Sequence, residues 1–210
     1  MEDKFINVIT LGSEAVGKTS IINRIKEGKF DEKIATTIGM KHTIIKRKYE
    51  KKNLTICLNF RDTMGQEIYQ NIMPLQYIRD CHVVLLVFCN IDTLDDIKRR
   101  WYNFYKENAN VSDSRFILVG NKSDIFGNER DEIVKQGEKF AEEINAHFIT
   151  CSAKSADNMD NLERYIVTEA KRFINNEENK NSDGGYQQSK SFHVKKHNKE
   201  KDKENSDCKC

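Results

Sequence analysis

Apolar and polar residues alternate in blocks along the first 175 residues, and the spacing inside each block predicts its secondary structure. Continuous apolar runs such as 82–88 predict strands that are buried on both faces, and apolar residues at helical spacing predict helices. The polar residues 50–53 between two strand-like runs predict an antiparallel hairpin. We expect strands near 5–11, 41–50, 54–61, 82–88, 116–120 and 147–150, and helices near 18–27, 93–108, 130–144 and 158–174. Their alternation predicts an α/β fold with a mainly parallel sheet.

Composition divides the chain into one domain and an appendage. Residues 176–210 are polar and charged with few apolar groups, so we expect a disordered tail after a domain spanning residues 1–175. Lys and Arg number 35 against 33 Asp and Glu, which gives no indication of nucleic-acid binding. Cysteines scattered through strand-like runs fit reduced thiols in the cytosol. We expect no signal peptide and no membrane-spanning segment.

Residues 12–19 fit the phosphate-loop pattern, in which Gly is followed by four residues, Gly, Lys and then Ser or Thr. The segment is Gly12-Ser13-Glu14-Ala15-Val16-Gly17-Lys18-Thr19. It lies between a predicted strand and a predicted helix, so its backbone N–H groups and the helix dipole would face an anion. Lys18 would reach the terminal phosphates, and the Thr19 hydroxyl would ligate Mg²⁺. The alternative is an ordinary glycine turn between strand and helix.

Two later segments carry side chains that would complete such a site. Thr37 follows the first helix and offers a second hydroxyl to Mg²⁺, which requires near-octahedral oxygen ligands. Asp62 ends the third strand and would hold the ion through a water. In the same segment, Gly65 would bring its N–H close to a γ-phosphate, and Gln66 would orient the attacking water. Taken alone, each segment is also consistent with a plain loop or turn.

Two tetrapeptides beyond predicted strands would recognise a base. They are Asn121-Lys122-Ser123-Asp124 and Cys151-Ser152-Ala153-Lys154. Asp124 can accept two N–H bonds from the edge of guanine, whereas adenine offers no such donor pair. Asn121 would join this loop to the phosphate loop, the Lys122 stem would cover the base, and the Ala153 N–H would bond the guanine carbonyl. All of these segments follow the carboxyl ends of strands, where open α/β sheets bind ligands.

Taken together, these motifs resemble the Ras superfamily of small GTPases over residues 4–174, and the chain looks like a Rab. The Rab likeness rests on Phe30-Asp31, Thr37-Ile38-Gly39, residues 62–67 and Tyr77-Ile78-Arg79-Asp80. Residues 73–80 and Gly17-Lys18-Thr19-Ser20 are most similar to the Golgi subgroup. The resemblance implies a P-loop NTPase small G domain, with a six-stranded, mainly parallel sheet, one antiparallel strand and about five flanking helices.

The resemblance also implies the ligands and their residues. The cofactors would be GTP or GDP and Mg²⁺, with Gln66 and Lys18 in catalysis and with Thr19, Thr37 and Asp62 at the metal. Phe30 would pack against the guanine and ribose. The nucleotide-binding set implied in this way is Gly12, Glu14, Ala15, Val16, Gly17, Lys18, Thr19, Ser20, Phe30, Thr37, Gly65, Asn121, Lys122, Asp124, Ser152, Ala153 and Lys154.

A Rab-like chain would act as a switch whose loops near 30–40 and 62–78 are held by GTP through Thr37 and Gly65. The resemblance implies an exchange factor, effectors, a GDP-dissociation inhibitor or Rab escort protein, and a GTPase-activating protein that supplies an arginine in trans. We expect a monomer with no nucleic-acid partner. Two other interpretations remain open: a nucleotide-bound adaptor that hardly turns over, and a general P-loop ATPase in which Asp124 is coincidental.

The chain ends in Cys208-Lys209-Cys210, which resembles the Cys-x-Cys end on which Rabs receive two geranylgeranyl groups. Two lipid chains meet the requirement for stable anchoring, which a single chain does not. We therefore expect the protein in the cytosol and, through this lipid anchor, on the cytoplasmic face of an endomembrane, the Golgi or vesicles. The alternative is a solvated tail whose cysteines bind metal or oxidise.

Six positions, in three groups, depart from the Rab pattern. Arg61 and Met64 stand where Rabs have Trp and Ala, and Met40-Lys41-His42 stands where they carry an apolar residue, an acid and Phe. These changes remove aromatic area that anchors interfaces, so we expect an effector set of its own. Glu14 places a carboxylate near the γ-phosphate, and we expect it to slow hydrolysis.

Overall fold

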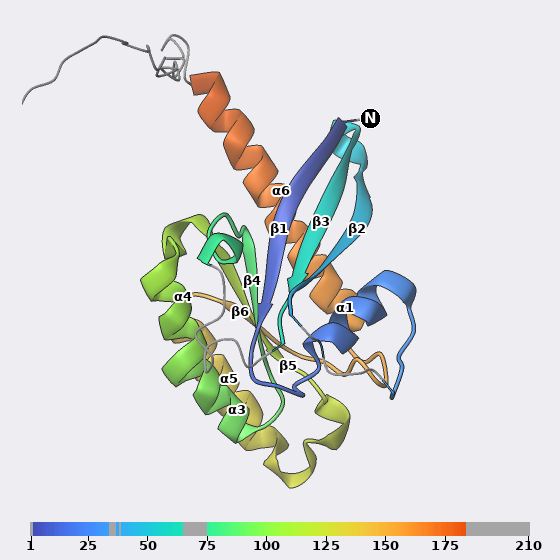
Figure 1. Ribbon diagram of the computed structural model, residues 1–210, viewed down its shortest axis with the longest axis vertical. Coiled ribbons are helices and arrows are strands. Elements are labelled where there is room, and N and C mark those ends of the chain that lie inside the picture. Colours follow the sequence, from blue (N-terminus) through green and yellow to red (C-terminus); the bar gives the residue numbers. More distant parts are fainter. Residues whose placement is uncertain (1, 34–36, 38, 65–74, 184–210) are drawn as a thin grey trace, which may run out of the picture.

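The computed structural model describes residues 2–33, 37, 39–64 and 75–183 and forms a helix-flanked sheet (Figure 1). The six strands lie in the order β2-β3-β1-β4-β5-β6. Only the β2–β3 pair is antiparallel, which confirms the predicted hairpin and the predicted fold class. The strands are β1 (Glu2–Leu11), β2 (Lys41–Tyr49), β3 (Leu54–Asp62), β4 (Val83–Phe88), β5 (Arg115–Gly120) and β6 (His147–Thr150).

Helices cover both faces of this sheet. The helices α1 and α6 lie on one face, and α3, α4 and α5 lie on the other (Figure 1). Their apolar side chains form two separate core clusters with the strands, one on each face. Every residue of β4 is buried, as expected for a central parallel strand with both faces covered. Within the described residues, the α-helices are α1 (Lys18–Glu27), α3 (Ile91–Asp96), α4 (Tyr102–Asn108), α5 (Arg130–Glu143) and α6 (Met159–Asp183).

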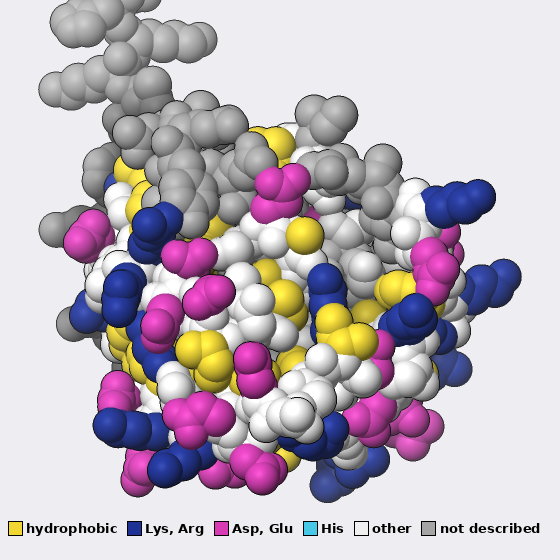
Figure 2. All heavy atoms as spheres, turned by 90° about the horizontal axis from the view of Figure 1, so that it is seen from below, with side chains coloured by type: hydrophobic (Ala, Val, Ile, Leu, Met, Phe, Trp, Pro, Cys, Tyr) yellow, Lys and Arg dark blue, Asp and Glu magenta, His cyan; other side chains and the backbone are white. Residues whose placement is uncertain are grey.

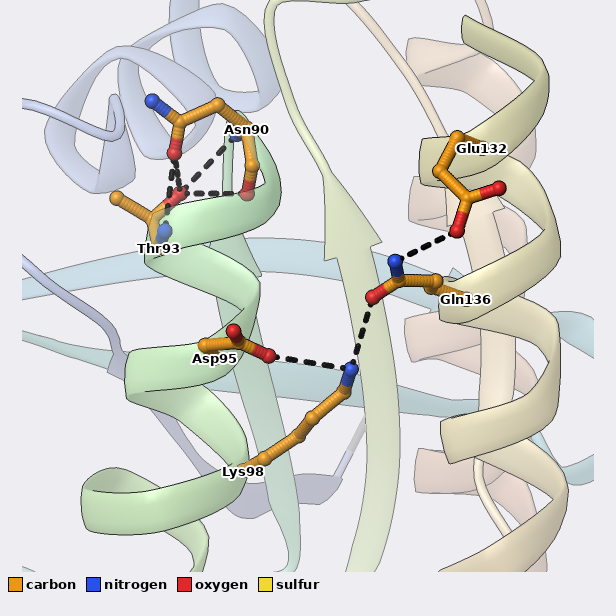
Figure 3. Close-up of polar contacts among 6 residues, drawn as sticks. All are labelled: Asn90, Thr93, Asp95, Lys98, Glu132 and Gln136. Carbon is orange, nitrogen blue, oxygen red and sulfur yellow. Dashed lines mark hydrogen bonds and ion pairs between the residues drawn. The ribbon is translucent and has the colours of Figure 1, made fainter. Parts of the chain in front are cut away.

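The helix predicted near 93–108 is interrupted. A π-helical turn, Ile97–Trp101, joins α3 to α4, and the run begins at Ile91 because Asn90 and Thr93 form a capping box. Figure 3 shows this cap, in which the Thr93 N–H donates to Asn90 Oδ1 at 2.9 Å. Further along, Lys98 lies between Asp95 on α3 and Gln136 on α5, with its Nζ 3.2 Å from Gln136 Oε1. Gln136 in turn donates to Glu132, so a polar chain links the two helices.

The last helix is longer than the sequence predicted. We expected it to end near 174, but α6 continues to Asp183. The first turns of α6 pack on the sheet through Met159, Leu162 and Ile166. Beyond that contact, Lys52 in the β2–β3 turn forms an ion pair with Glu178. In the part of the chain that the structure describes, no helix combines the length and apolar character that a bilayer crossing requires.

Candidate nucleotide-binding site

The loop between β1 and α1 closes around the amine of its own lysine. Lys18 is only 4% exposed, and its Nζ donates to the carbonyl oxygens of Gly12 and Ser13, both at 2.9 Å. Gly12 and Gly17 have positive φ angles of 148° and 95°. A Cβ atom at Gly17 would lie 2.3 Å from Asn121 Nδ2, so glycine is needed there for both conformation and space. The loop therefore presents a fixed positive charge at the start of a helix.

Three oxygen atoms converge next to this loop. The Thr19 hydroxyl lies 2.7 Å from the Thr37 hydroxyl and 2.7 Å from Asp62 Oδ2. Asp62 is 1% exposed, and burial raises the pKa of its carboxyl, although the Thr19 hydrogen bond and the charge of Lys18 oppose that rise. Two hydroxyls and one carboxylate form an oxygen-only donor set, which suits Mg²⁺ completed by phosphate and water. Within the described residues, no cluster of three or more His, Cys, Asp or Glu side chains offers a rival metal site.

Asn121 connects the phosphate loop to the loop after β6. This side chain is 1% exposed; its Nδ2 donates to the Val16 carbonyl at 2.8 Å, and its Oδ1 accepts from the Ala153 N–H at 3.1 Å. The Ala153 N–H, which the sequence analysis assigned to a guanine carbonyl, thus already has an acceptor inside the protein. A carbonyl ligand would have to share this donor with Asn121.

Asp124 is oriented by the same loop. Ser152 Oγ donates to Asp124 Oδ1 at 2.6 Å, and Ser152 Oγ itself accepts the Ser155 N–H at 3.0 Å. Asp124 lies in a 3₁₀ turn, Ser123–Ile125, which follows β5. Lys122, the residue before this turn, has a φ angle of 63°, a left-handed conformation that turns the chain sharply. The carboxylate is therefore held on a short turn at the carboxyl end of a parallel strand, where such sheets bind ligands.

One pocket of about 410 Å³ joins these groups. Figure 2 views the molecule from this end and shows acidic and basic side chains interspersed over the face. Thr63, Ile125 and Glu32 also line the pocket, and we did not predict them as site residues. Thr63 lies inside the 62–67 segment and Ile125 follows the tetrapeptide 121–124, but neither pattern assigns these positions a ligand contact. The predicted site residues that line it are Glu14, Ala15, Gly17, Lys18, Thr19, Ser20, Phe30, Thr37, Asn121, Lys122, Asp124, Ala153 and Lys154.

Other predicted residues lie behind this lining or outside the described residues. Gly12 and Val16 contribute the backbone carbonyls already mentioned, and Asp62 and Ser152 touch lining side chains through their hydrogen bonds. Gly65, Gln66, Cys208 and Cys210 lie outside the described residues.

Comparison with known proteins agrees with this geometry. A family model described as the Ras family matches residues 7–172. The chain belongs to the Ras family. It is 34% identical over 164 residues to the Ras-related protein Rab-5B of Plasmodium falciparum (isolate 3D7), a match that covers 77% of this chain and 75% of the relative. The resemblance to Rab-type small GTPases is thereby confirmed, whereas the Golgi subgroup stays a prediction.

Two of the positions that depart from the Rab pattern, His42 and Arg61, lie side by side in this Ras-family protein. His42 pairs with Arg61 across β2 and β3, and the rings of His42 and Tyr77 are 5.6 Å apart. Arg61 Nη1 donates to the carbonyls of Tyr77 and Arg79 at 2.7 and 3.1 Å. Its Nε is buried and has no hydrogen-bond partner among the described residues. The guanidinium group of Arg61 thus holds residues 77–79, which precede β4, by hydrogen bonds. The Rab pattern has a tryptophan at this position.

The phosphate loop of this Rab-type protein also contacts α3. Ser13 Oγ donates to Asp96 Oδ2 at 2.9 Å, and Arg100 lies 3.7 Å from Asp96 Oδ1. The phosphate-loop pattern allows any residue after the first glycine, which is the position of Ser13. The sequence pattern therefore could not predict the Ser13–Asp96 hydrogen bond. It connects the loop to the first helix on the opposite face of the sheet.

Proposed function

We propose that this Rab-type chain binds GTP and GDP with Mg²⁺, hydrolyses GTP and acts as a membrane-attached switch in vesicle trafficking. The observation that carries this proposal is one continuous pocket. At one end it has the buried Lys18 and the oxygen cluster around Thr19, and at the other end it has Asp124. Membership of the Ras family, whose members are GTPases, supports it.

At the phosphate end, each residue has a defined task. The backbone N–H groups of the loop and the start of α1 would bind the polyphosphate. Lys18, held by the Gly12 and Ser13 carbonyls, would place its ammonium group at the terminal phosphates without further ordering. Thr19 and Thr37 would ligate Mg²⁺, and Asp62 would hold it through a water; the ion would offset the negative charge of the phosphates.

At the base end, Asp124 would accept the two N–H donors of guanine. Adenine lacks this donor pair, so its binding would displace water from the carboxylate without supplying the two N–H bonds of guanine, and sites of this kind discriminate strongly. Lys122 and Phe30 both line the pocket and would cover the base and ribose. The Ala153 N–H would share its hydrogen between Asn121 Oδ1 and the guanine carbonyl.

Hydrolysis would use Gln66 to orient the attacking water and Gly65 to contact the γ-phosphate. A GTPase-activating protein would supply an arginine, and an exchange factor would release GDP. Two prenyl groups on Cys208 and Cys210 would attach the chain to the cytoplasmic face of an endomembrane, and a GDP-dissociation inhibitor or Rab escort protein would carry it through the cytosol. Effectors would recognise the GTP-bound form.

Competition binding with the full chain tests the nucleotide assignment. With Mg²⁺ present, unlabelled GDP should displace fluorescent GDP at least about a hundredfold more effectively than ADP does. Asp124→Ala should remove that preference, whereas Asp160→Ala, at the exposed start of α6, should keep it. Equal displacement by ADP in the wild type would support the general P-loop ATPase, and the absence of binding by either nucleotide would refute the proposal.

The adaptor with little turnover is the second candidate, because Glu14 and Met64 both lie at the pocket. Gln66→Leu discriminates the two functions. In a working switch it should raise the GTP-bound fraction of the purified chain after incubation with GTP, whereas in an adaptor that fraction should not change.

Imaging tests the anchor. A tagged chain should lie on an internal membrane, and the Cys208→Ser/Cys210→Ser double variant should be diffuse. Identical distributions of the two would contradict lipid attachment.

A further inference from the structure

Among the described residues, Arg24 of α1 makes three hydrogen bonds, all to backbone carbonyl oxygens. Its Nε donates to Ala153 at 2.8 Å, and its Nη2 donates to Lys154 at 2.9 Å. Its Nη1 donates at 2.6 Å to Gly28, the residue that caps the end of α1. The guanidinium group therefore joins the end of the phosphate-loop helix to the loop after β6, which lies far away in sequence.

The loop that Arg24 holds is the one that positions the base-recognition groups. The Ala153 N–H bonds Asn121, and Ser152 orients Asp124, as described above. Ala153 is thus fixed on both sides of its backbone, by Asn121 at the N–H of this residue and by Arg24 at its carbonyl. Loss of the arginine would free one side and allow the Ser152–Asp124 pair to move.

The base end of the pocket has two walls, one formed by the loop after β6 and the other by residues 30–32, and Arg24 contacts the chain next to both. Gly28 leads directly to Phe30, Asp31 and Glu32, which line the pocket. Glu32 also forms an ion pair with Lys154 at 2.8 Å, across the pocket from one wall to the other. That pair is exposed and contributes little by itself. The Arg24 Nε bond to Ala153 is partly buried and therefore less screened by water, so we take Arg24 as the main connection between the two walls.

We propose that Arg24 is a positioning residue that sets the guanine preference of the pocket and slows nucleotide release, by holding the Ala153–Lys154 backbone against the end of α1. This inference rests on the proposed nucleotide-binding function. It adds a residue, Arg24, that does not line the pocket but affects nucleotide binding through the loop it holds. Arginine suits the task because its planar group reaches several acceptors at once, whereas lysine would reach fewer of them with a single ammonium group.

Arg47 provides a matched control. It also contacts the last turn of α1, where its Nη2 donates to the Ile25 carbonyl at 3.1 Å, and its Nε pairs with Glu163 of α6. It makes no hydrogen bond to the loop after β6 within the described structure. Replacing Arg47 therefore removes a similar brace on the same helix turn but leaves the base end intact.

The experiment compares Arg24→Gln, Arg24→Lys and Arg47→Gln in the full chain. Two quantities are measured with Mg²⁺ present: the dissociation rate of fluorescent GDP, and the ratio of affinities for GDP and inosine diphosphate, which lacks the exocyclic amine. Arg24→Gln should release GDP about tenfold faster and lower the ratio severalfold. Arg24→Lys should fall between it and the wild type, and Arg47→Gln should match the wild type in both quantities.

The outcomes separate this inference from the proposed function. If the wild type prefers GDP but Arg24→Gln and Arg47→Gln give the same release rate and the same ratio, Arg24 is only a structural brace and the inference fails alone. If the wild type binds neither diphosphate, both proposals fail. Should Arg24→Gln not fold, a ratio and release rate of Arg24→Lys equal to those of the wild type would overturn the inference.

Discussion

The two ends of the central sheet use buried polar groups for different purposes. At the carboxyl ends of the strands, Lys18 and Asn121 are buried in the lining of a pocket, and Asp62 is buried behind it and hydrogen-bonded to Thr19 of the lining. At the opposite end, buried polar groups satisfy one another: Tyr105 hydrogen-bonds Ser114, and Ser114 donates to the Cys81 carbonyl, both at 2.7 Å. Burial alone therefore does not mark a functional residue. What a buried group faces decides whether it serves ligand binding or stability.

The buried carboxylate of Glu169 illustrates the stabilising end. It is 1% exposed on α6, and its Oε1 lies 2.5 Å from Arg172 Nη1 and 3.1 Å from His147 Nε2. These partners come from α6 and β6, so the carboxylate joins the helix to the edge of the sheet. We expect substitutions at this end to change the free energy of unfolding and substitutions at the other end to change nucleotide affinity.

The largest effect is expected from Lys18→Met. This change keeps the length of the side chain but removes the buried ammonium group, and the affinity for GDP should fall at least about a hundredfold. Isothermal titration calorimetry measures it. Lys26→Met, on the exposed side of the same helix, should leave the affinity within about twofold. A Lys18→Met protein that binds GDP as tightly as the wild type would show that the loop binds phosphate without its lysine.

Glu169→Ala should show the reverse behaviour. It removes the buried carboxylate that His147 and Arg172 contact, and because both partners are partly exposed and stay hydrated, the free energy of unfolding should fall by about 1.5 kcal/mol in urea denaturation. The GDP affinity of the folded fraction should stay near that of the wild type. Glu107→Ala, at an exposed position near the end of α4, is the control for stability. A loss of affinity without a loss of stability would contradict the division between the two ends.

Glu14→Ser tests whether this carboxylate at the pocket impairs chemistry. Removing a negative charge near the γ-phosphate should raise the single-turnover rate of GTP hydrolysis by about threefold to tenfold. Glu27→Ser, at the exposed end of α1, should leave the rate unchanged. Equal rates for the wild type and Glu14→Ser would remove the hypothesis.

The smallest effect concerns pH at the stabilising end. His82 Nδ1 accepts the Asn7 N–H at 3.0 Å, and burial lowers the pKa of this imidazole despite the nearby Glu177 carboxylate. Because the pKa is lower in the folded state, the unfolded chain binds the proton more readily. The free energy of unfolding should therefore fall as pH drops below about 6.5.

Urea unfolding at pH 7.5 and 5.5 measures this loss, which should stay below about 1 kcal/mol for His82. His82→Asn keeps an acceptor but does not titrate, so its stability should fall less over the same interval. An equal fall in both proteins would assign the acid sensitivity to other groups. GDP affinity should be the same in both proteins at pH 7.5, because His82 lies away from the pocket.

Local pattern predicted the fold class well, whereas the roles assigned to the residues of the phosphate end stay predictions. The strand bounds follow from apolar runs such as β4, and the loop from Gly12 to Thr19 is a contiguous motif whose geometry depends on nearby residues. The base end was harder to predict, because Arg24 reaches residues 129 and 130 positions away. No periodicity or spacing rule connects such residues, and only the folded sheet brings them together.

Two helix errors have similar causes. The extension of α6 to Asp183 runs through polar residues that a composition argument assigns to a disordered tail, although Lys52 from a distant hairpin pairs with one of them. The spacing of apolar residues did not predict the π-helical turn at Ile97–Trp101. One additional residue changes the spacing between neighbouring apolar positions only slightly, so the run still resembles a regular helix.

That wide turn holds one residue more than a regular helical turn would between two fixed contacts. Before it, Asp96 reaches the Ser13 hydroxyl; after it, Tyr105 is buried against the sheet. Removing one residue at the turn would restore regular winding and keep both contacts on their faces, because the π turn accommodates the additional residue. The same deletion inside α3 or α4 would rotate one half relative to the other by about 100°, and either Asp96 would leave the phosphate loop or Tyr105 would leave the core. The turn is therefore the place in this segment where the chain can lose a residue with the least damage.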